Sequence, residues 1–153
     1  MFRPREYLIP ANIEEAATLL SHAGEKGVVV GGGTFLHGLV ARGLLSHVEV
    51  LVDLRQTGLD YLADEGEALV VGPMVRFERL LTSPTFQGAA LAALRGAAAC
   101  PPVQVRTMAT IGGTICAAMP TFDIPCALVA LGAEVVLRGP SGQRVVPLES
   151  LFL

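Results

Sequence analysis

Tryptophan is absent from this sequence of 153 residues, and charged side chains are scarce. Asp, Glu, Lys and Arg make up 16% of the chain against 52% hydrophobic residues, and the mean hydropathy is +0.55. A chain this apolar can bury a core, which excludes intrinsic disorder. The net charge is −3, Lys26 is the single lysine, and no basic block occurs, so we expect no nucleic-acid partner.

Long apolar runs are missing as well. The nearest candidates are interrupted by Arg95 and Glu134, so none reaches the ~18 uncharged apolar residues of a membrane-spanning helix. The N-terminal residues carry no apolar stretch typical of a signal peptide. We therefore expect a cytoplasmic protein without a membrane span.

Cysteine is rare and irregularly placed. Cys100, Cys116 and Cys126 are an odd number without paired short spacing, and the three histidines show no metal-ligand spacing. This pattern supports neither a disulfide framework nor a metal site. We expect the cysteines to be small buried hydrophobic residues.

The first 56 residues alternate between short apolar strands and helical patterns, which predicts a small parallel α/β lobe over 1–56. Asn12 with Glu15 three residues later resembles a capping box, and Thr34 is the expected N-cap of a second helix. The expected elements are strands at 7–9, 28–30 and 48–54, and helices at 13–23 and 35–40.

The pattern changes after Gly58, and residues 57–153 predict a second, α+β lobe whose strands are mainly antiparallel. Two runs joined by turn residues are typical of hairpins. The Ala-rich stretch before Pro101-Pro102 predicts one continuous helix. The expected elements are strands at 59–63 and 68–71, helices at 77–81, 86–99 and 124–131, and strands at 133–137 and 143–146.

Glycine, with 17 residues, is the informative excess. Gly31-Gly32-Gly33-Thr34 follows a strand and opens a helix, an arrangement that turns main-chain N–H groups toward an anion such as phosphate. The dinucleotide fingerprint fails because the next glycine, Gly38, comes two positions late, and the P-loop fails because Leu39-Val40 replaces its Lys and Ser/Thr. A tight turn without any ligand is the alternative.

A second segment, Thr110 to Thr114, again places glycines between hydroxyl residues, now in the second lobe. One such pair is typical of a simple turn. Two segments, one in each lobe, favour a long ligand between the lobes, such as a dinucleotide with a central pyrophosphate. Arg106 is a candidate phosphate partner, although a surface salt bridge is the commoner outcome.

Three ordered motifs now carry a resemblance. The chain resembles the FAD-binding medium subunit of molybdenum hydroxylases, of the carbon monoxide dehydrogenase and xanthine dehydrogenase type. The resemblance spans nearly the whole sequence, and the motifs are specific as a set. They are Gly31-Gly32-Gly33-Thr34-x-Leu36, then Val105-Arg106-x-x-Ala109-Thr110-Ile111-Gly112-Gly113, then Pro120-x-x-Asp123-x-Pro125-x-Ala127-Leu128-x-Ala130-Leu131-Gly132-Ala133.

The resemblance implies a two-lobed α+β fold of the PCMH type with FAD between the lobes. It implies no metal ligand and no catalytic side chain, since the flavin carries the chemistry. Asp123 matches a family carboxylate that contacts FAD, although an Asp before Ile124-Pro125 also suits a helix N-cap. The implied FAD contacts are Val29, Val30, Gly31, Gly32, Gly33, Thr34, Phe35, Leu36, Cys100, Thr110, Ile111, Gly112, Gly113, Thr114 and Asp123.

The resemblance also implies partners: an iron–sulfur small subunit, a molybdopterin large subunit, and NAD or another acceptor for the electrons. Family members often carry Asn where this chain has Thr107 and Thr114. They also continue for about a hundred further residues, the size of one small domain. We therefore expect weak FAD binding, or a further chain that completes the site.

Two other functions remain open from the sequence. One is a non-catalytic assembly or remnant module that keeps the fold without a working flavin site. The other is a stand-alone flavin reductase similar to the enolpyruvyl-glucosamine reductases, which the segment from Arg106 to Asp123 fits poorly. For the flavin site we expect Gly32→Val to abolish FAD binding, by placing a branched side chain where the pyrophosphate approaches.

Overall fold

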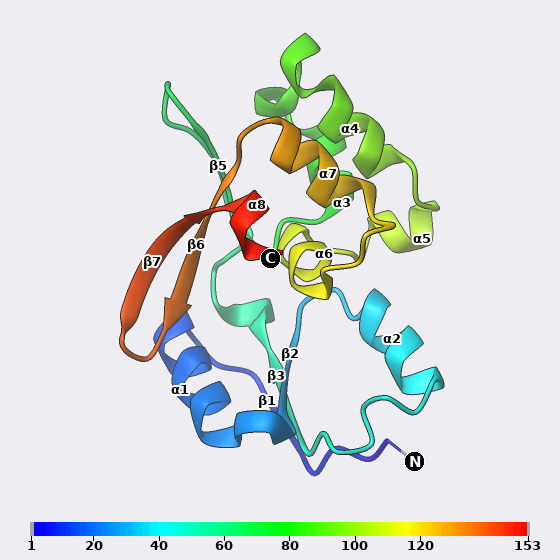
Figure 1. Cartoon of the computed structure of the whole chain (residues 1–153), viewed down its shortest axis with the longest axis vertical. Coiled ribbons are helices and arrows are strands. Elements are labelled where there is room, and N and C mark those ends of the chain that lie inside the picture. The colour runs from blue at the N-terminus through cyan, green and yellow to red at the C-terminus, as the bar shows by residue number, and fades with distance from the viewer. Residues whose placement is uncertain (1, 153) are drawn as a thin grey trace.

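The structure is a computed structural model in which residues 2–152 are described. Its first part is built on a three-stranded parallel sheet in the order β1-β3-β2. One helix lies on each face of this sheet (Figure 1). The parallel α/β arrangement predicted for this part is confirmed. Its elements are β1 (Glu6–Leu8), α1 (Ile13–Ala23), β2 (Gly27–Val30), α2 (Thr34–Ala41) and β3 (Val50–Asp53).

The predicted cap of α1 is confirmed in detail. Asn12 Oδ1 accepts a hydrogen bond from the Glu15 N–H (2.9 Å), and Glu15 Oε2 accepts one from the Ala11 N–H (2.8 Å). Both bonds satisfy main-chain donors at the helix start. The helix ends at Ala23, its C-cap Gly24 has a φ of +54° that suits glycine, and a 3-10 turn, η1 (Gly24–Lys26), leads into β2.

The second part packs short helices around a separate hydrophobic core in which Phe77, Leu80, Phe86 and Ala98 are buried. These helices form the upper half of the molecule, and α6 lies closest to the parallel sheet (Figure 1). Their bounds are α3 (Phe77–Thr82), α4 (Ala92–Ala99), α5 (Val103–Arg106), α6 (Ile111–Ala117), α7 (Asp123–Ala130) and α8 (Leu148–Leu151).

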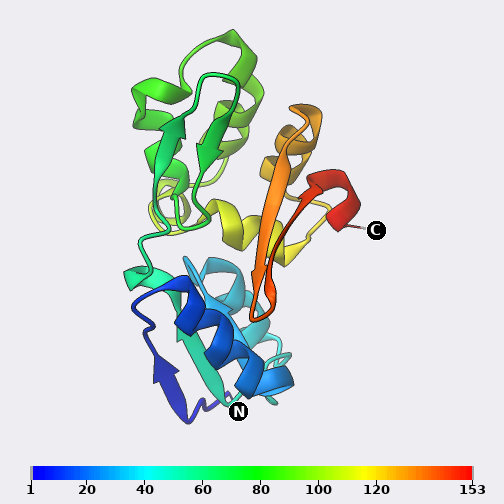
Figure 2. The same cartoon turned by 90° about the vertical axis from the view of Figure 1, so that its left-hand side faces the viewer.

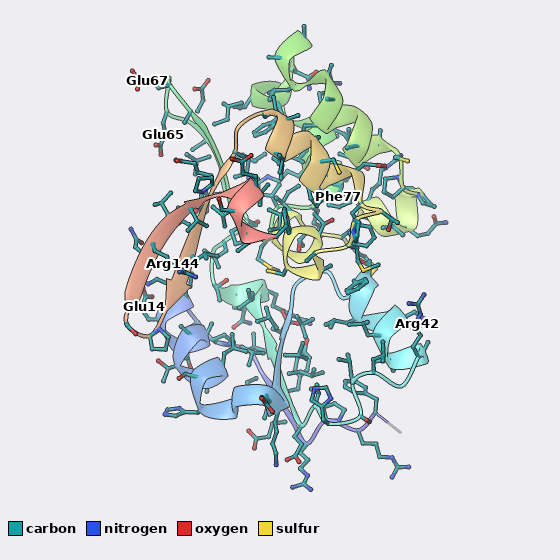
Figure 3. All side chains as sticks on the ribbon, in the orientation of Figure 1. Glu14, Arg42, Glu65, Glu67, Phe77 and Arg144 are labelled. Atoms are coloured by element: carbon teal, nitrogen blue, oxygen red, sulfur yellow. The ribbon has the colours of Figure 1, made fainter. Side chains whose placement is uncertain are left out.

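Two antiparallel hairpins complete this part, each a sheet of its own, and with the parallel sheet they confirm the predicted α+β fold. The second hairpin reaches back to α1 (Figure 2), where an Arg138 guanidinium nitrogen lies 2.9 Å from Glu14 Oε1. Figure 3 shows Glu14 beside the hairpin tip that carries Arg144. The division at 56/57 stays a prediction. The strands are β4 (Leu62–Asp64), β5 (Leu69–Val71), β6 (Glu134–Gly139) and β7 (Gly142–Pro147).

The continuous helix predicted for 86–99 is wrong. The backbone of Gly88 has a φ of +110°, which no α-helix tolerates, so α4 begins only at Ala92. Short 3-10 turns, η3 (Pro84–Phe86) and η4 (Ala89–Leu91), replace its first turns. The first hairpin strand also begins later than predicted, at Leu62.

A buried carboxylate ties β1 to the end of β3. Asp53 is 2% exposed. It accepts hydrogen bonds from the side-chain Nε and the main-chain N–H of Arg55 (2.9 Å each) and from the Tyr7 hydroxyl. Arg55 belongs to the 3-10 turn η2 (Leu54–Gln56). Burial alone raises the pKa of Asp53, but the hydrogen bonds from Arg55 and Tyr7 outweigh it and hold that pKa below its ordinary value.

Asp53→Asn should lower the free energy of unfolding at pH 7 by about 1–2 kcal/mol, because the neutral amide loses charge-assisted hydrogen bonds. Since the folded pKa is lowered, the contribution of the carboxylate is complete above its unfolded pKa of about 3.9 and is lost as pH falls through the folded value. Urea unfolding at pH 7 and at about pH 3 measures both effects.

The matched control is Glu49→Gln. Glu49 also pairs with cations, Arg5 and Lys26, but on the surface. Its substitution should therefore lower the free energy of unfolding by less than Asp53→Asn does. The free energies of unfolding of wild type and Asp53→Asn should converge at low pH. If their difference stays constant down to about pH 2, the variant loses stability through packing and the ionic explanation is wrong.

Candidate functional site

The end of β2 lies directly against the segment that precedes α6. A Cβ atom added to Gly32 would stand 1.9 Å from the carbonyl oxygen of Met108, and one added to Gly31 would stand 2.8 Å from Thr110 Oγ1. Real Cβ atoms do not approach main chain this closely, so only glycine allows the contact. The two glycine segments therefore adjoin, as the sequence predicts.

This contact corrects the reason given above for the effect of Gly32→Val. The side chain of a larger residue at Gly32 would collide with the backbone of Met108 and Ala109 rather than with a ligand. The glycine is needed to join the two parts of the chain. Loss of binding in that variant would follow from disruption of the junction.

Helix α2 begins at this junction with free main-chain donors. Gly33, with φ +71°, is its N-cap, so Thr34 is the first helical residue and the N-cap predicted at Thr34 is wrong. Among residues 2–152, no acceptor forms a hydrogen bond with the N–H groups of Thr34, Phe35 and Leu36. These donors and the helix dipole make the start of α2 attractive to an anion.

The first turn of α6 differs, because its N–H groups already have acceptors within the protein. Thr110 is its N-cap, and the N–H groups of the two glycines are both used. These four N–H groups are therefore used within the protein, and the FAD contact expected for residues 110–114 stays a prediction. The pairs are Ile111 with Val75 O (2.9 Å), Gly112 with Pro73 O (2.8 Å), Gly113 with Thr110 Oγ1 (3.1 Å) and Thr114 with Thr110 O (3.0 Å).

A cavity of about 630 Å³ lies where the two segments meet. This volume falls in the range of small-molecule sites, and its lining is largely apolar, as such sites usually are. Most of the predicted contact residues line it. They are Val29, Gly31, Gly32, Gly33, Thr34, Phe35, Leu36, Thr110, Gly112, Gly113, Thr114 and Asp123.

Three predicted contacts are not among the lining residues. Val30 pairs with Asp53 in the sheet, Ile111 is buried in the core, and Cys100 is exposed at the end of α4. Met74, Pro101 and other apolar lining residues were not predicted, because they belong to no motif whose spacing indicates a binding site. Phe122 could have been found, since it directly precedes Asp123.

Asp123 is the only charged side chain among the described residues that line the cavity. It is the first residue of α7, and Phe122 is the N-cap, so the capping role considered for Asp123 is wrong. Arg106 forms the surface ion pair considered above, with its Nε 3.1 Å from Glu78 Oε2. An anionic ligand here would therefore rely on main-chain donors rather than on lysine or arginine.

The cysteines contradict the expectation of burial, since Cys100, Cys116 and Cys126 are all exposed. Cys116 lines the cavity, and partial loss of hydration there raises the pKa of its thiol. Within residues 2–152, no group of His, Cys, Asp and Glu is placed to hold a metal ion. Every helix over the same residues is too short or too polar to cross a bilayer.

A family model described as the FAD binding domain in molybdopterin dehydrogenase matches residues 1–153. The chain belongs to this family. FAD is accordingly its cofactor, and the resemblance drawn from the three motifs is confirmed.

Relatives of this FAD-binding domain are subunits of oxidoreductases. The medium chain of carbon monoxide dehydrogenase from Hydrogenophaga pseudoflava is 34% identical over 100% of this chain and 54% of its own length. The corresponding chain from Afipia carboxidovorans is 36% identical over 92% and 49%. A solved structure of quinoline 2-oxidoreductase from Pseudomonas putida 86 superposes with a TM-score of 0.89 at 28% identity, over 97% and 52%.

The FAD-binding domain spans about half the length of the curated relatives it matches. It shares their α+β fold over almost all of its own residues. The comparisons therefore establish the family, the fold and the cofactor of this chain.

Gly32→Ala should lower the free energy of unfolding of the FAD-free domain by about 3 kcal/mol, because even one methyl group overlaps the Met108 carbonyl. Gly38 lies inside α2, and a Cβ atom added there would meet open space. Gly38→Ala should therefore raise the free energy of unfolding by about 0.5–1 kcal/mol. Urea unfolding compares the two. Equal stability of Gly32→Ala and wild type would show that the junction tolerates a side chain.

Proposed function

We propose that this chain holds FAD between its two parts and passes electrons through it within a molybdenum-containing hydroxylase or dehydrogenase. The observation that carries the proposal is the free first turn of α2, whose three N–H donors stand at a cavity shared by both glycine segments. An anionic group fits there because donors and helix dipole act together.

The N–H groups of Thr34, Phe35 and Leu36 would bind the diphosphate of FAD, and the Thr34 hydroxyl offers another donor. Gly33 leaves open space beside them, because a Cβ atom added there would have no neighbour within 4 Å. Residues 110–114 would then form the opposite wall of the cavity. This assignment gives the first glycine segment the binding role and the second the supporting one.

Asp123 would have a different role. A carboxylate offers hydrogen-bond acceptors and negative charge, so it suits hydroxyl and N–H donors of the ligand and repels phosphate. The start of α2 and Asp123 therefore favour different portions of one extended molecule. FAD offers both, with a diphosphate in its middle and ribose, ribityl and ring donors on either side.

FAD supplies the ability to accept electrons singly and release them in pairs, while the protein supplies position and electrostatics. In this proposal the electrons come from an iron–sulfur subunit fed by a molybdopterin subunit, and leave to NAD or another acceptor. The names of the relatives support a multi-subunit assembly, since they denote medium chains and subunits of dehydrogenases. The chain would be active only within such a complex.

A second candidate function is an assembly module without a working flavin site. The occupied N–H groups of α6 favour it, because they leave the diphosphate with donors from one segment only. Co-purification with both proposed partner subunits separates the two functions. A stable complex whose flavin absorbance disappears on washing would favour the module, whereas retained flavin that is reduced on adding the substrate of the complex would favour electron transfer.

Thr34→Asp should separate flavin binding from stability. A carboxylate in the first turn of α2 favours the helix dipole, so the FAD-free variant should melt at or above the wild-type temperature. The same carboxylate repels a diphosphate, so the Kd for FAD should rise about tenfold or more. Titration by flavin fluorescence and a thermal melt provide the two measurements.

Thr18→Asp on the exposed face of α1 is the control, since it adds the same charge away from the cavity. It should leave the Kd for FAD unchanged. If Thr34→Asp binds FAD as tightly as wild type, the diphosphate does not bind at the start of α2 and the assignment is wrong.

A further inference from the structure

Two aromatic rings meet across the cavity. Phe35 comes from the first turn of α2, and Phe122 comes from the residue just before α7. Their ring centroids are 5.8 Å apart and their planes cross at 83°, an edge-to-face contact. Both side chains are half-buried and both line the cavity.

Each ring is attached to a group that the proposed function uses. The N–H of Phe35 is one of the three free donors of α2, and Phe122 is bonded to Asp123, the one charged residue of the lining. The backbones that carry the donor and the carboxylate are therefore linked through the two rings. Loss of the ring contact would remove this link between the two groups.

The ring pair is the one directional contact between α2 and the start of α7 among the described residues. Within residues 2–152, no hydrogen bond or ion pair connects α2 with α7. Other contacts between the two parts lie elsewhere: at Gly31 and Gly32 against the segment before α6, between α2 and α6, and at Glu14 with Arg138. Edge-to-face rings prefer a defined distance and angle because of their quadrupoles, so the pair can set the spacing here.

We propose that Phe35 and Phe122 are positioning residues for FAD. Their contact sets the separation between the anion-binding start of α2 and the carboxylate of Asp123, so that one extended ligand meets both. This inference rests on the proposed function of the same cavity. It adds a determinant of affinity that lies in one side chain of α2 and in the N-cap residue of α7, outside the glycine motifs.

The experiment is a double-mutant cycle on the full chain with FAD as the probe. Phe35→Leu and Phe122→Leu keep an apolar side chain but remove the ring contact, and each should raise the Kd for FAD about 2- to 10-fold. The double variant should lose little more than the weaker-binding single variant, because both remove one interaction. Phe35→Tyr keeps the ring and should bind within about twofold of wild type.

The visible circular dichroism of bound flavin reports its orientation, and it should change in both leucine variants but not in Phe35→Tyr. Phe152→Leu, outside the cavity lining, is the control for loss of an aromatic residue and should change neither Kd nor spectrum. Urea unfolding of the FAD-free proteins shows whether a variant has lost stability instead.

Two results would overturn the inference. One is an additive cycle, in which the losses of affinity of the single variants sum in the double variant. The other is leucine variants that bind FAD with wild-type Kd and spectrum. If wild type itself shows no saturable FAD binding, the proposed function of the cavity fails, and that result is distinguishable because it appears before any variant is made.

Discussion

The main-chain contact of Gly32 with Met108 and Ala109 is the constraint on which the site depends. It brings the end of β2 against the segment before α6, and so places the start of α2 and the first turn of α6 at one cavity. A side chain at this position would separate them, because close-packed backbones leave no room for it. Gly32, which resembles part of a phosphate-binding motif, thus joins the two parts of the chain, while its neighbour Gly33 supplies the turn into α2.

The electrostatics of the cavity follow from the sparse charge of the sequence. Only Asp123 among the described lining residues carries a charge, and it is negative. An anion in such a site cannot be neutralised by a side chain and must face oriented main-chain dipoles, which act more strongly where water is displaced. This makes geometry rather than net charge the basis of selectivity: a ligand must present its anionic portion to α2 and its donors to Asp123.

Local patterns in the sequence predicted local structure well. The cap at Asn12 and the two hairpins depend on residues close together in the sequence, and each is present. Two local predictions failed: the backbone conformation of Gly88 interrupted a helix that alanine composition favoured, and Gly33 rather than Thr34 is the N-cap of α2. The motifs also indicated that the two glycine segments meet. What the sequence could not provide was the partner of each polar group, since the acceptors for the N–H groups of Ile111 and Gly112 come from Val75 and Pro73, far from the glycine motif itself. The exposure of Cys116 depends in the same way on the cavity beside it.

The contacts that join the two parts of the molecule differ in stiffness. The ion pair of Glu14 with Arg138 is largely exposed, with side chains 61% and 34% accessible, and pairs of this kind contribute little. The main-chain junction at Gly32 cannot shift without breaking backbone packing. The ring pair of Phe35 and Phe122 is intermediate. Its edge-to-face packing favours one distance and angle, but the rings can shift without breaking a hydrogen bond. The cavity is therefore fixed on its glycine side, and its dimensions between α2 and α7 depend on the two side chains that the glycine motifs do not contain.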